Sequence, residues 1–146
     1  MRKVIRGGTV VNARETVRAD VLIDGESIAA IGEVDAPDAE VIDATGCYLL
    51  PGLIDNHTHL SMPFGGTTSA DDYDTGTQAA AAGGVTCIVD FALQMEPNGL
   101  QSSLEQWQAR AEGCAHVDYG FHMAITRSDD ATFADMQRMV DQGVTS

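Results

Sequence analysis

The residues best suited to chemistry are two histidines, His57 and His59, which end a short apolar stretch that begins at Leu53. If this stretch is a β-strand, side chains two positions apart share a face, so the two imidazoles project the same way, along with Leu53 and Asp55. Two imidazoles in this arrangement can bind one metal ion, because zinc readily takes imidazole ligands and a catalytic zinc site keeps a position open for water. Taken alone, such a pair is more often two ordinary polar side chains at a strand end, so its surroundings decide.

The length and composition are those of one ordinary globular domain. The chain has 146 residues, 44% of them hydrophobic and 21% charged, which is enough to bury a substantial core. It has no apolar run of about 18 residues, as a membrane-spanning helix would need. Its charged start leads into Gly7-Gly8 and not into the apolar region of a secretory signal. Cys47, Cys87 and Cys114 are widely separated within apolar stretches, which favours reduced thiols and a cytoplasmic location.

The charge balance bears on the partners of the protein. The formal net charge is −14, and the acidic residues are dispersed along the chain. This balance argues against nucleic acid or an anionic membrane surface as a partner. Lysine occurs only once, as Lys3.

Residues 1–50 are predicted to form the strands of a small, all-β unit. Short β-branched runs alternate with turn signals, among them Gly7-Gly8 and Asp24-Gly25, and the latter favours a hairpin. Two further short strands are expected at Val41-Ile42 and Tyr48-Leu50. This unit offers no residues with evident chemistry, so we interpret it as scaffold.

From Pro51 onwards the pattern changes to alternating strands and helices. Strand starts near Leu53, Val85, Val117 and Val144 recur roughly every 30 residues, the size of a β-α unit, with a helix expected between each pair. Consecutive β-α units imply a parallel sheet. Residues 51–146 would then be three units and the start of a fourth strand, either of a (β/α)₈ barrel or of a doubly wound sheet. A complete barrel takes about 250 residues, so we expect only its first part here.

Local signals set the expected helix limits. Ser69 with Asp72 predicts a capping box for a helix over 70–82, and Ser102 with Glu105 predicts another for the next helix. Glycines at 83–84 and 143 are expected to end helices. The apolar faces are predicted to be Leu104, Trp107 and Ala111 on the second helix, and Phe133, Met136 and Val140 on the third.

Alternation along the strands gives candidates for supporting residues. On the strand from Val85, Asp90 shares a face with Thr86 and Ile88, and on the strand from Val117, His122 shares a face with Asp118 and Gly120. If these mixed faces look into a barrel, Asp55, Asp90 and His122 lie inside, near the carboxyl ends of neighbouring strands where active sites of barrels are found. They would then support the metal ligands from behind, or else make only local hydrogen bonds.

Several motifs resemble those of one known family over nearly the whole chain. They are Val41-Ile42-Asp43-Ala44-Thr45-Gly46, Leu50-Pro51-Gly52-Leu53-Ile54-Asp55-x-His57-x-His59, Met62-Pro63-Phe64-Gly65, Gly83-Gly84-Val85-Thr86, Asp90-Phe91-Ala92 and Asp118-Tyr119-Gly120-Phe121-His122. Together they resemble the cyclic amidohydrolases of the metal-dependent amidohydrolase superfamily, and in particular the dihydropyrimidinase and D-hydantoinase family.

The resemblance implies a fold, an activity and cofactors. The fold is a (β/α)₈ TIM barrel with a β-sandwich, and the assembly is a homotetramer. The activity is hydrolytic ring opening of a small neutral cyclic amide, a 5,6-dihydropyrimidine or a 5-substituted hydantoin, by metal-bound hydroxide at a binuclear centre. The cofactors are two divalent metal ions, usually Zn²⁺, and His57 and His59 match ligands of one of them.

The resemblance also implies ligands that these residues do not include. A carboxylated lysine that bridges the metals is expected just beyond Ser146, and the remaining histidines and the catalytic aspartate fall later still. Lys3, in the first strand of the other unit, cannot replace that lysine. We therefore expect no catalytic proton-transfer residue within residues 1–146, and we expect these residues alone to be inactive.

The segment after His59 bears on the substrate. Dihydroorotases place an arginine at the position of Ser61 to bind a substrate carboxylate, whereas here the segment Leu60-Ser61-Met62-Pro63-Phe64 is largely apolar. Met62 and Phe64 are candidates for an apolar lid over a hydrophobic 5-substituent, or else they merely pack the loop. The alternatives are another cyclic amidohydrolase, such as an allantoinase or a dihydroorotase, and a non-catalytic assembly homologue, against which the two histidines speak.

Overall fold

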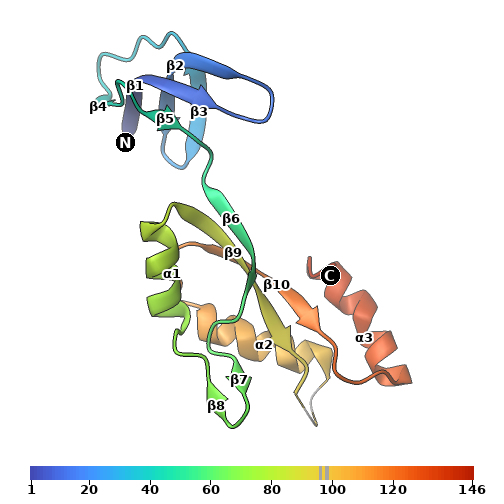
Figure 1. Ribbon diagram of the computed structural model, residues 1–146. Helices are drawn as coiled ribbons and strands as arrows, with labels where there is room; N and C mark the ends of the chain where they lie inside the picture. The colour runs from blue at the N-terminus through green and yellow to red at the C-terminus, as the bar shows by residue number, and fades with distance from the viewer. Residues whose placement is uncertain (96, 98) are drawn as a thin grey trace. The chain divides into compact units, whose positions relative to one another are not determined.

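The computed structural model describes residues 1–95, 97 and 99–146, which fall into two compact units, Met1–Pro51 and Gly52–Ser146 (Figure 1). The first unit holds a sheet with the strand order β3-β2-β1-β4, and β5 also pairs with β1. Its strands are β1 (Arg2–Val11), β2 (Thr16–Asp24), β3 (Ser27–Gly32), β4 (Glu40–Asp43) and β5 (Tyr48–Leu49).

The first unit confirms the predicted hairpin and corrects the predicted first turn. β2 and β3 pair antiparallel around Gly25, whose φ of 60° suits glycine. Gly7-Gly8 does not form a turn, because β1 runs through it with a shift of register between Ile5 and Gly8. Such an irregularity lets a long strand bend without ending. The buried core is small and is built from Val4, Leu22 and Ala36.

The second unit is built on a parallel sheet with the strand order β10-β9-β6. The elements in chain order are β6 (Leu53–Thr58), β7 (Pro63–Phe64), β8 (Thr67–Thr68), α1 (Tyr73–Ala82), β9 (Val85–Leu93), α2 (Leu100–Ala111), β10 (Asp118–Ala124) and α3 (Asp130–Asp141). The backbone N–H of Met123 donates to the carbonyl of Ser146 over 2.8 Å, so the residues after α3 begin to follow β10. The predicted β-α alternation is confirmed, and mixed α/β is the fold class of this unit.

Helices α1, α2 and α3 pack on one face of this sheet. Ile88 and Ala92 of β9 join Tyr73 of α1, Trp107 of α2 and Met139 of α3 in a single buried cluster. The predicted apolar face of α2 is confirmed, because Leu104, Trp107 and Ala111 are all fully buried. In Figure 1, β6 lies in front and α2 lies behind the sheet, so the other face of the sheet is turned toward the viewer. We call this other face the open face; it carries the side chain of Phe91.

The helix starts differ from the predicted ones. Asp72, not Ser69, caps α1: its carboxylate accepts from the Thr75 N–H over 2.9 Å, and the Thr75 hydroxyl receives the Asp72 N–H in return. Ser69 is engaged elsewhere, since its hydroxyl accepts from the Met62 N–H over 2.8 Å. Helix α2 begins after Gly99, so Ser102 lies inside the helix and the predicted capping box there is wrong.

The predicted helix ends are confirmed, but the apolar stripe of α3 is not buried. Gly84 and Gly143, with φ of 84° and 86°, follow helices α1 and α3 as expected. The stripe of Phe133, Met136 and Val140 exists, but these side chains are 59%, 43% and 48% exposed. The described part of the chain therefore covers this stripe only in part. None of the described helices is both long and apolar enough to span a membrane.

Candidate metal centre

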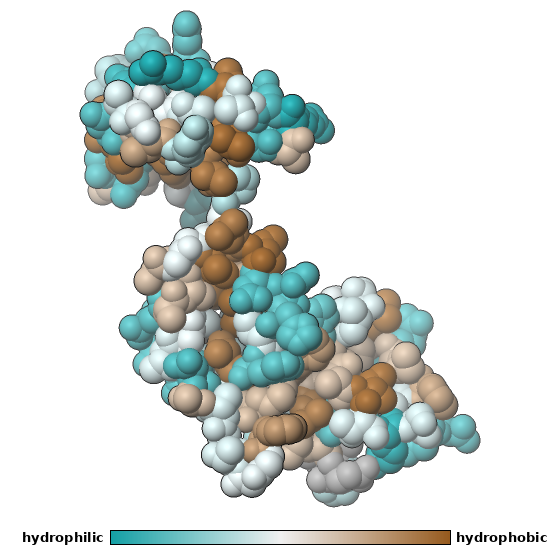
Figure 2. Space-filling model, viewed as in Figure 1, coloured by the Kyte–Doolittle hydropathy of each residue, from teal (hydrophilic) through white to brown (hydrophobic). Residues whose placement is uncertain are grey.

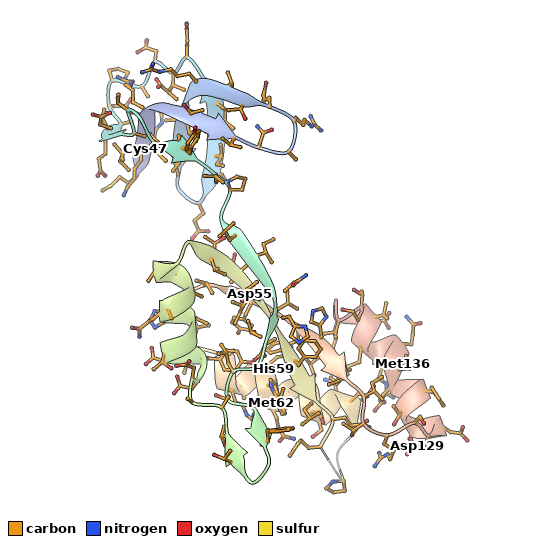
Figure 3. The ribbon with its side chains drawn as sticks, in the orientation of Figure 1. Cys47, Asp55, His59, Met62, Asp129 and Met136 are labelled. Atoms are coloured by element: carbon orange, nitrogen blue, oxygen red, sulfur yellow. The ribbon has the colours of Figure 1, made fainter. Side chains whose placement is uncertain are left out.

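The two predicted ligands lie together at the carboxyl end of β6. His57 belongs to the strand and His59 follows its last residue, Thr58. Their ring centroids are 5.0 Å apart and their planes meet at 87°. Both side chains are exposed, on the open face (Figure 3, which labels His59). The predicted convergence of the two imidazoles is therefore present in the structure.

Phe91 of β9 lies beneath both imidazoles. Its ring centroid is 4.6 Å from that of His57 and 5.0 Å from that of His59. His122 of β10, the register partner of Phe91, also lies against this ring, with a centroid distance of 4.8 Å. Sequence reasoning placed Phe91 on the opposite face and missed this contact.

His122 lies on the open face, as predicted, and connects strands that are not neighbours. Its Nε2 is 3.0 Å from the carbonyl oxygen of Asn56 on β6, and its Nδ1 is 2.6 Å from the hydroxyl of Ser146. A carbonyl oxygen only accepts, so Nε2 carries the proton in the neutral ring and Nδ1 accepts from Ser146. Both nitrogens of His122 thus have hydrogen-bond partners. Its ring contacts Phe91, and Phe91 in turn contacts both His57 and His59.

The predicted placement of Asp90 is wrong. Asp90 is fully buried on the helix side of β9, where its carboxylate accepts from the Tyr73 hydroxyl over 2.5 Å. It also accepts from the backbone N–H of Leu60 over 3.2 Å. The two faces of β9 are the reverse of the predicted ones. Both faces of this strand are largely apolar, so the alternation of residues does not distinguish them, and a polar residue such as Asp90 is then expected on the barrel interior. Burial raises the pKa of the Asp90 carboxyl, and its hydrogen bonds offset this only in part.

Asp55 lies on β6 with the histidines but does not bond to either ring. Its Oδ1 accepts from the backbone N–H of His57 over 3.1 Å, and its side chain is exposed (Figure 3). The contact fixes the backbone of β6 next to its first histidine, at a point where the register with β9 shifts between Asp55 and Thr58.

The segment after His59 is held at successive backbone atoms. The Leu60 N–H bonds to Asp90, and the Ser61 N–H donates to the carbonyl of Asp71 over 2.9 Å. The Ser61 carbonyl accepts from Nη1 of Arg110 on α2, also over 2.9 Å. Ser61 has a φ of 50°, an uncommon value for a residue with a side chain. These bonds fix the direction in which the chain leaves the histidine pair.

A short hairpin follows, where the sequence predicted only a loop. β7 and β8 pair antiparallel around Gly65 and Gly66, whose φ values are 58° and 83°. Positive φ at both central residues is typical of a tight hairpin turn, so the Gly-Gly pair was the available signal. Figure 3 shows Met62 on the way from His59 to this hairpin.

An open pocket lies between His59 and the hairpin. It has a volume of about 510 Å³ and is lined by His59, Met62, Phe64, Thr67, Thr68 and Ser69. Phe64 is 83% exposed, so it does not pack its own loop. Figure 2 shows hydrophilic residues over the middle of the open face, with apolar residues beside them.

The donor set suits a divalent metal ion but does not complete its coordination. Imidazole is a common ligand of zinc, and a catalytic zinc site usually has three protein ligands. Among the described residues, no group of three or more His, Cys, Asp or Glu side chains is placed to hold a metal ion. His57 and His59 therefore fit two positions of such a coordination sphere and no more.

The comparisons with known proteins show the family of the chain. A model of the dihydro-orotase-like family matches residues 46–144, and the chain belongs to that family. Within it, the chain is similar to D-hydantoinases and dihydropyrimidinases. It is 48% identical to a D-hydantoinase of Streptomyces coelicolor, over 99% of this chain and 32% of that protein. It is 47% identical to a D-hydantoinase of Geobacillus stearothermophilus, over 100% of this chain and 31% of that protein.

A solved structure gives the same result. The crystal structure of dihydropyrimidinase from Brevibacillus agri matches with a TM-score of 0.96 and 53% identity, over 99% of this chain and 32% of that one. The chain thus spans roughly a third of the length of the relatives that it matches.

Proposed function

We propose that this chain supplies the first metal-binding histidines of a cyclic amidohydrolase that opens a dihydropyrimidine or a 5-substituted hydantoin by hydrolysis. The observation that carries the proposal is the His57–His59 pair at the carboxyl end of β6, beside an open pocket. In barrels of parallel strands, this end is where active sites lie. The names of the similar proteins, D-hydantoinase and dihydropyrimidinase, support the same reaction class.

The architecture that fits this function is a (β/α)₈ barrel. A doubly wound sheet would carry helices on both faces. Here α1, α2 and α3 share one face, and the open face carries the histidines. This arrangement favours the barrel of the two architectures that the β-α pattern allows.

His57 and His59 would hold a divalent metal ion, with zinc favoured by the imidazole donors. Bound divalent metal ions supply Lewis acidity and lower the pKa of water toward neutrality. The other ligands, including the carboxylated lysine implied beyond Ser146, would come from the remainder of the protein. Asp55 and Asp90 act on the backbone beside the histidines: Asp55 accepts from the N–H of His57, and Asp90 accepts from the N–H of Leu60.

Met62 and Phe64 would form the apolar wall against the ring substituent. Phe64 is largely exposed in the pocket that contains His59, so a bulky apolar group can cover it. Ser61 carries no charge to pair with a substrate carboxylate, and its carbonyl is occupied by Arg110. The site therefore suits a neutral ring and not dihydroorotate.

A substrate comparison on the full-length, metal-loaded protein tests this function. Dihydrouracil and a hydantoin with an aromatic 5-substituent should be hydrolysed, dihydroorotate should not, and His57→Ala should abolish turnover. Preference for dihydroorotate would indicate a different cyclic amidohydrolase. A metal-loaded protein that hydrolyses none of these rings would indicate a non-catalytic homologue.

A further inference from the structure

Phe91 has surroundings unlike those of the other large apolar side chains of its sheet. It is half-buried on the open face of β9, the central strand in the order β10-β9-β6. It does not belong to the hydrophobic cluster that the described residues form under the helices. Its ring neighbours are the imidazoles of His57, His59 and His122.

The contacts hold the histidine pair from one side. The Phe91 plane is tilted by 47° to the His57 ring and by 46° to the His59 ring, at centroid distances of 4.6 and 5.0 Å. Tilted aromatic contacts at such distances are favourable. A rigid ring in this position excludes side-chain rotamers in which either imidazole would fold down onto the sheet. The imidazoles are then left with orientations that point away from β9.

His122 also contacts Phe91. It is the register partner of Phe91, and its ring lies 4.8 Å away at a tilt of 40°. Its hydrogen bonds to Asn56 and Ser146 fix its own ring. Phe91 is therefore in contact with a fixed imidazole as well as with the exposed pair, and this contact limits the orientations open to its ring.

We propose that Phe91 is a positioning residue for the metal site: it orders the imidazoles of His57 and His59 before a metal ion binds. The inference rests on the proposed function, because it takes these histidines as ligands. Ordering exposed side chains costs conformational entropy. If the ordering is already present in the metal-free protein, binding does not bear that cost, and the affinity for the metal rises.

The test replaces Phe91 with Leu in the full-length protein and measures zinc affinity by competition with a chelator. The matched control is Phe121→Leu. Phe121 lies one position before His122 on β10, but its side chain packs against the cluster under the helices. Both variants lose an aromatic ring, and only Phe91→Leu loses one that touches the histidine pair. Both side chains are only partly buried, so each variant is expected to fold.

Phe91→Leu should weaken zinc binding by about 10–100-fold, the usual effect of removing a support behind a metal ligand. Phe121→Leu should change it by less than about threefold. The absorption spectrum of the Co²⁺-substituted protein should change for Phe91→Leu and not for Phe121→Leu, because it reports ligand geometry and not stability.

The outcomes separate the inference from the proposed function. Wild-type affinity and an unchanged Co²⁺ spectrum in Phe91→Leu would overturn the positioning role, even where His57→Ala abolishes metal binding. Equal losses in both Phe variants would also overturn it, since the effect would then be one of general stability. Metal binding that is independent of His57 would overturn the proposed function and this inference together.

Discussion

Arg110 of α2 donates from Nη1 to the backbone carbonyl of Ser61 over 2.9 Å, although 49 residues separate them in the chain. Its guanidinium also lies 4.1 Å from the centroid of the Trp107 ring. Arg110, on the helix side of the sheet, thereby holds the segment that follows the histidine pair. Because the Ser61 backbone adopts an uncommon φ of 50°, that segment depends on contacts from outside itself.

Arg110→Met is expected to loosen the segment 60–62. It removes a hydrogen bond from a charged donor, worth about 1.5–3 kcal/mol when partly buried. Hydrogen exchange at the amides of 60–62 should become faster, while exchange in β9 should change little. Arg138→Met is the control, because Arg138 forms an exposed pair with Asp135 on α3, 3.1 Å apart, and such pairs contribute little. Unchanged exchange in Arg110→Met would show that the segment holds its shape without α2.

Asp90→Asn is expected to lower the free energy of unfolding by about 1–3 kcal/mol, because the amide leaves a buried donor without an acceptor. Burial raises the folded pKa of Asp90, so the folded state binds this proton more tightly than the unfolded chain does. Its contribution to stability is therefore full below the ordinary aspartate range and is lost as the pH rises through the folded pKa. Asn does not titrate, so the deficit of the variant should shrink as the pH rises above the ordinary aspartate range.

Urea unfolding at a series of pH values measures this deficit. Tyr73→Phe serves as the control, since it removes the hydroxyl that bonds to Asp90 but keeps the titrating carboxyl. The Tyr73 bond lowers the pKa of Asp90, so its loss should raise the folded pKa further, and the unfolding free energy of Tyr73→Phe should still fall with rising pH. A deficit of Asp90→Asn that grows with pH would mean that the folded pKa of Asp90 is lowered, and that its hydrogen bonds outweigh its burial.

Gly52→Ala should destabilise the second unit at the start of β6. A Cβ at this position would lie 2.0 Å from Oγ1 and 2.7 Å from Cβ of Thr86 on β9. Overpacking of this kind costs about 1–3 kcal/mol. Gly120→Ala on β10 is the control, because a Cβ there meets nothing within 4 Å, and it should be neutral or slightly stabilising. Thermal unfolding of both variants makes the comparison, and equal midpoints would contradict the close approach of β6 and β9.

Phe64→Ala should impair hydrolysis of hydantoins with bulky apolar 5-substituents more than hydrolysis of dihydrouracil. Loss of part of an apolar pocket costs about 1–3 kcal/mol for the group that it contacted. The quantity to compare is kcat/KM for the two substrates in the full-length protein. Pro63→Ala, in the same hairpin but outside the lining of this pocket, is the control for a general effect on the loop. Equal losses on both substrates would remove Phe64 from substrate recognition.

The order of elements was predictable because it depends on local patterns. The recurrence of strand starts near Leu53, Val85 and Val117 indicated β6, β9 and β10, and the spacing of His57 and His59 indicated their convergence. The strand alternation also placed His122 on the correct face. These predictions needed only the period of the backbone.

The faces of β9 and the contacts across the sheet were not predictable in the same way. Asp90 is buried because Tyr73 and Leu60, which lie 17 and 30 residues away in the chain, supply its hydrogen bonds. From the sequence alone, an aspartate that is buried with such donors cannot be distinguished from an exposed one. The support that Phe91 and Arg110 give the site depends likewise on long-range packing. At α1 the sequence pattern indicated Ser69 as the cap, whereas Asp72 caps the helix and the Ser69 hydroxyl accepts from the Met62 N–H.

The central claim, that His57 and His59 hold a metal ion, is tested most directly by zinc affinity and stoichiometry in the full-length protein. His57→Ala and His59→Ala should each lose at least about tenfold in affinity, because each removes a ligand. His116→Ala is the matched control, since His116 pairs with Asp74 on the surface at 2.7 Å, and it should bind zinc as the wild type does. Unchanged zinc content and affinity in both His57→Ala and His59→Ala would contradict the assignment of these histidines as metal ligands.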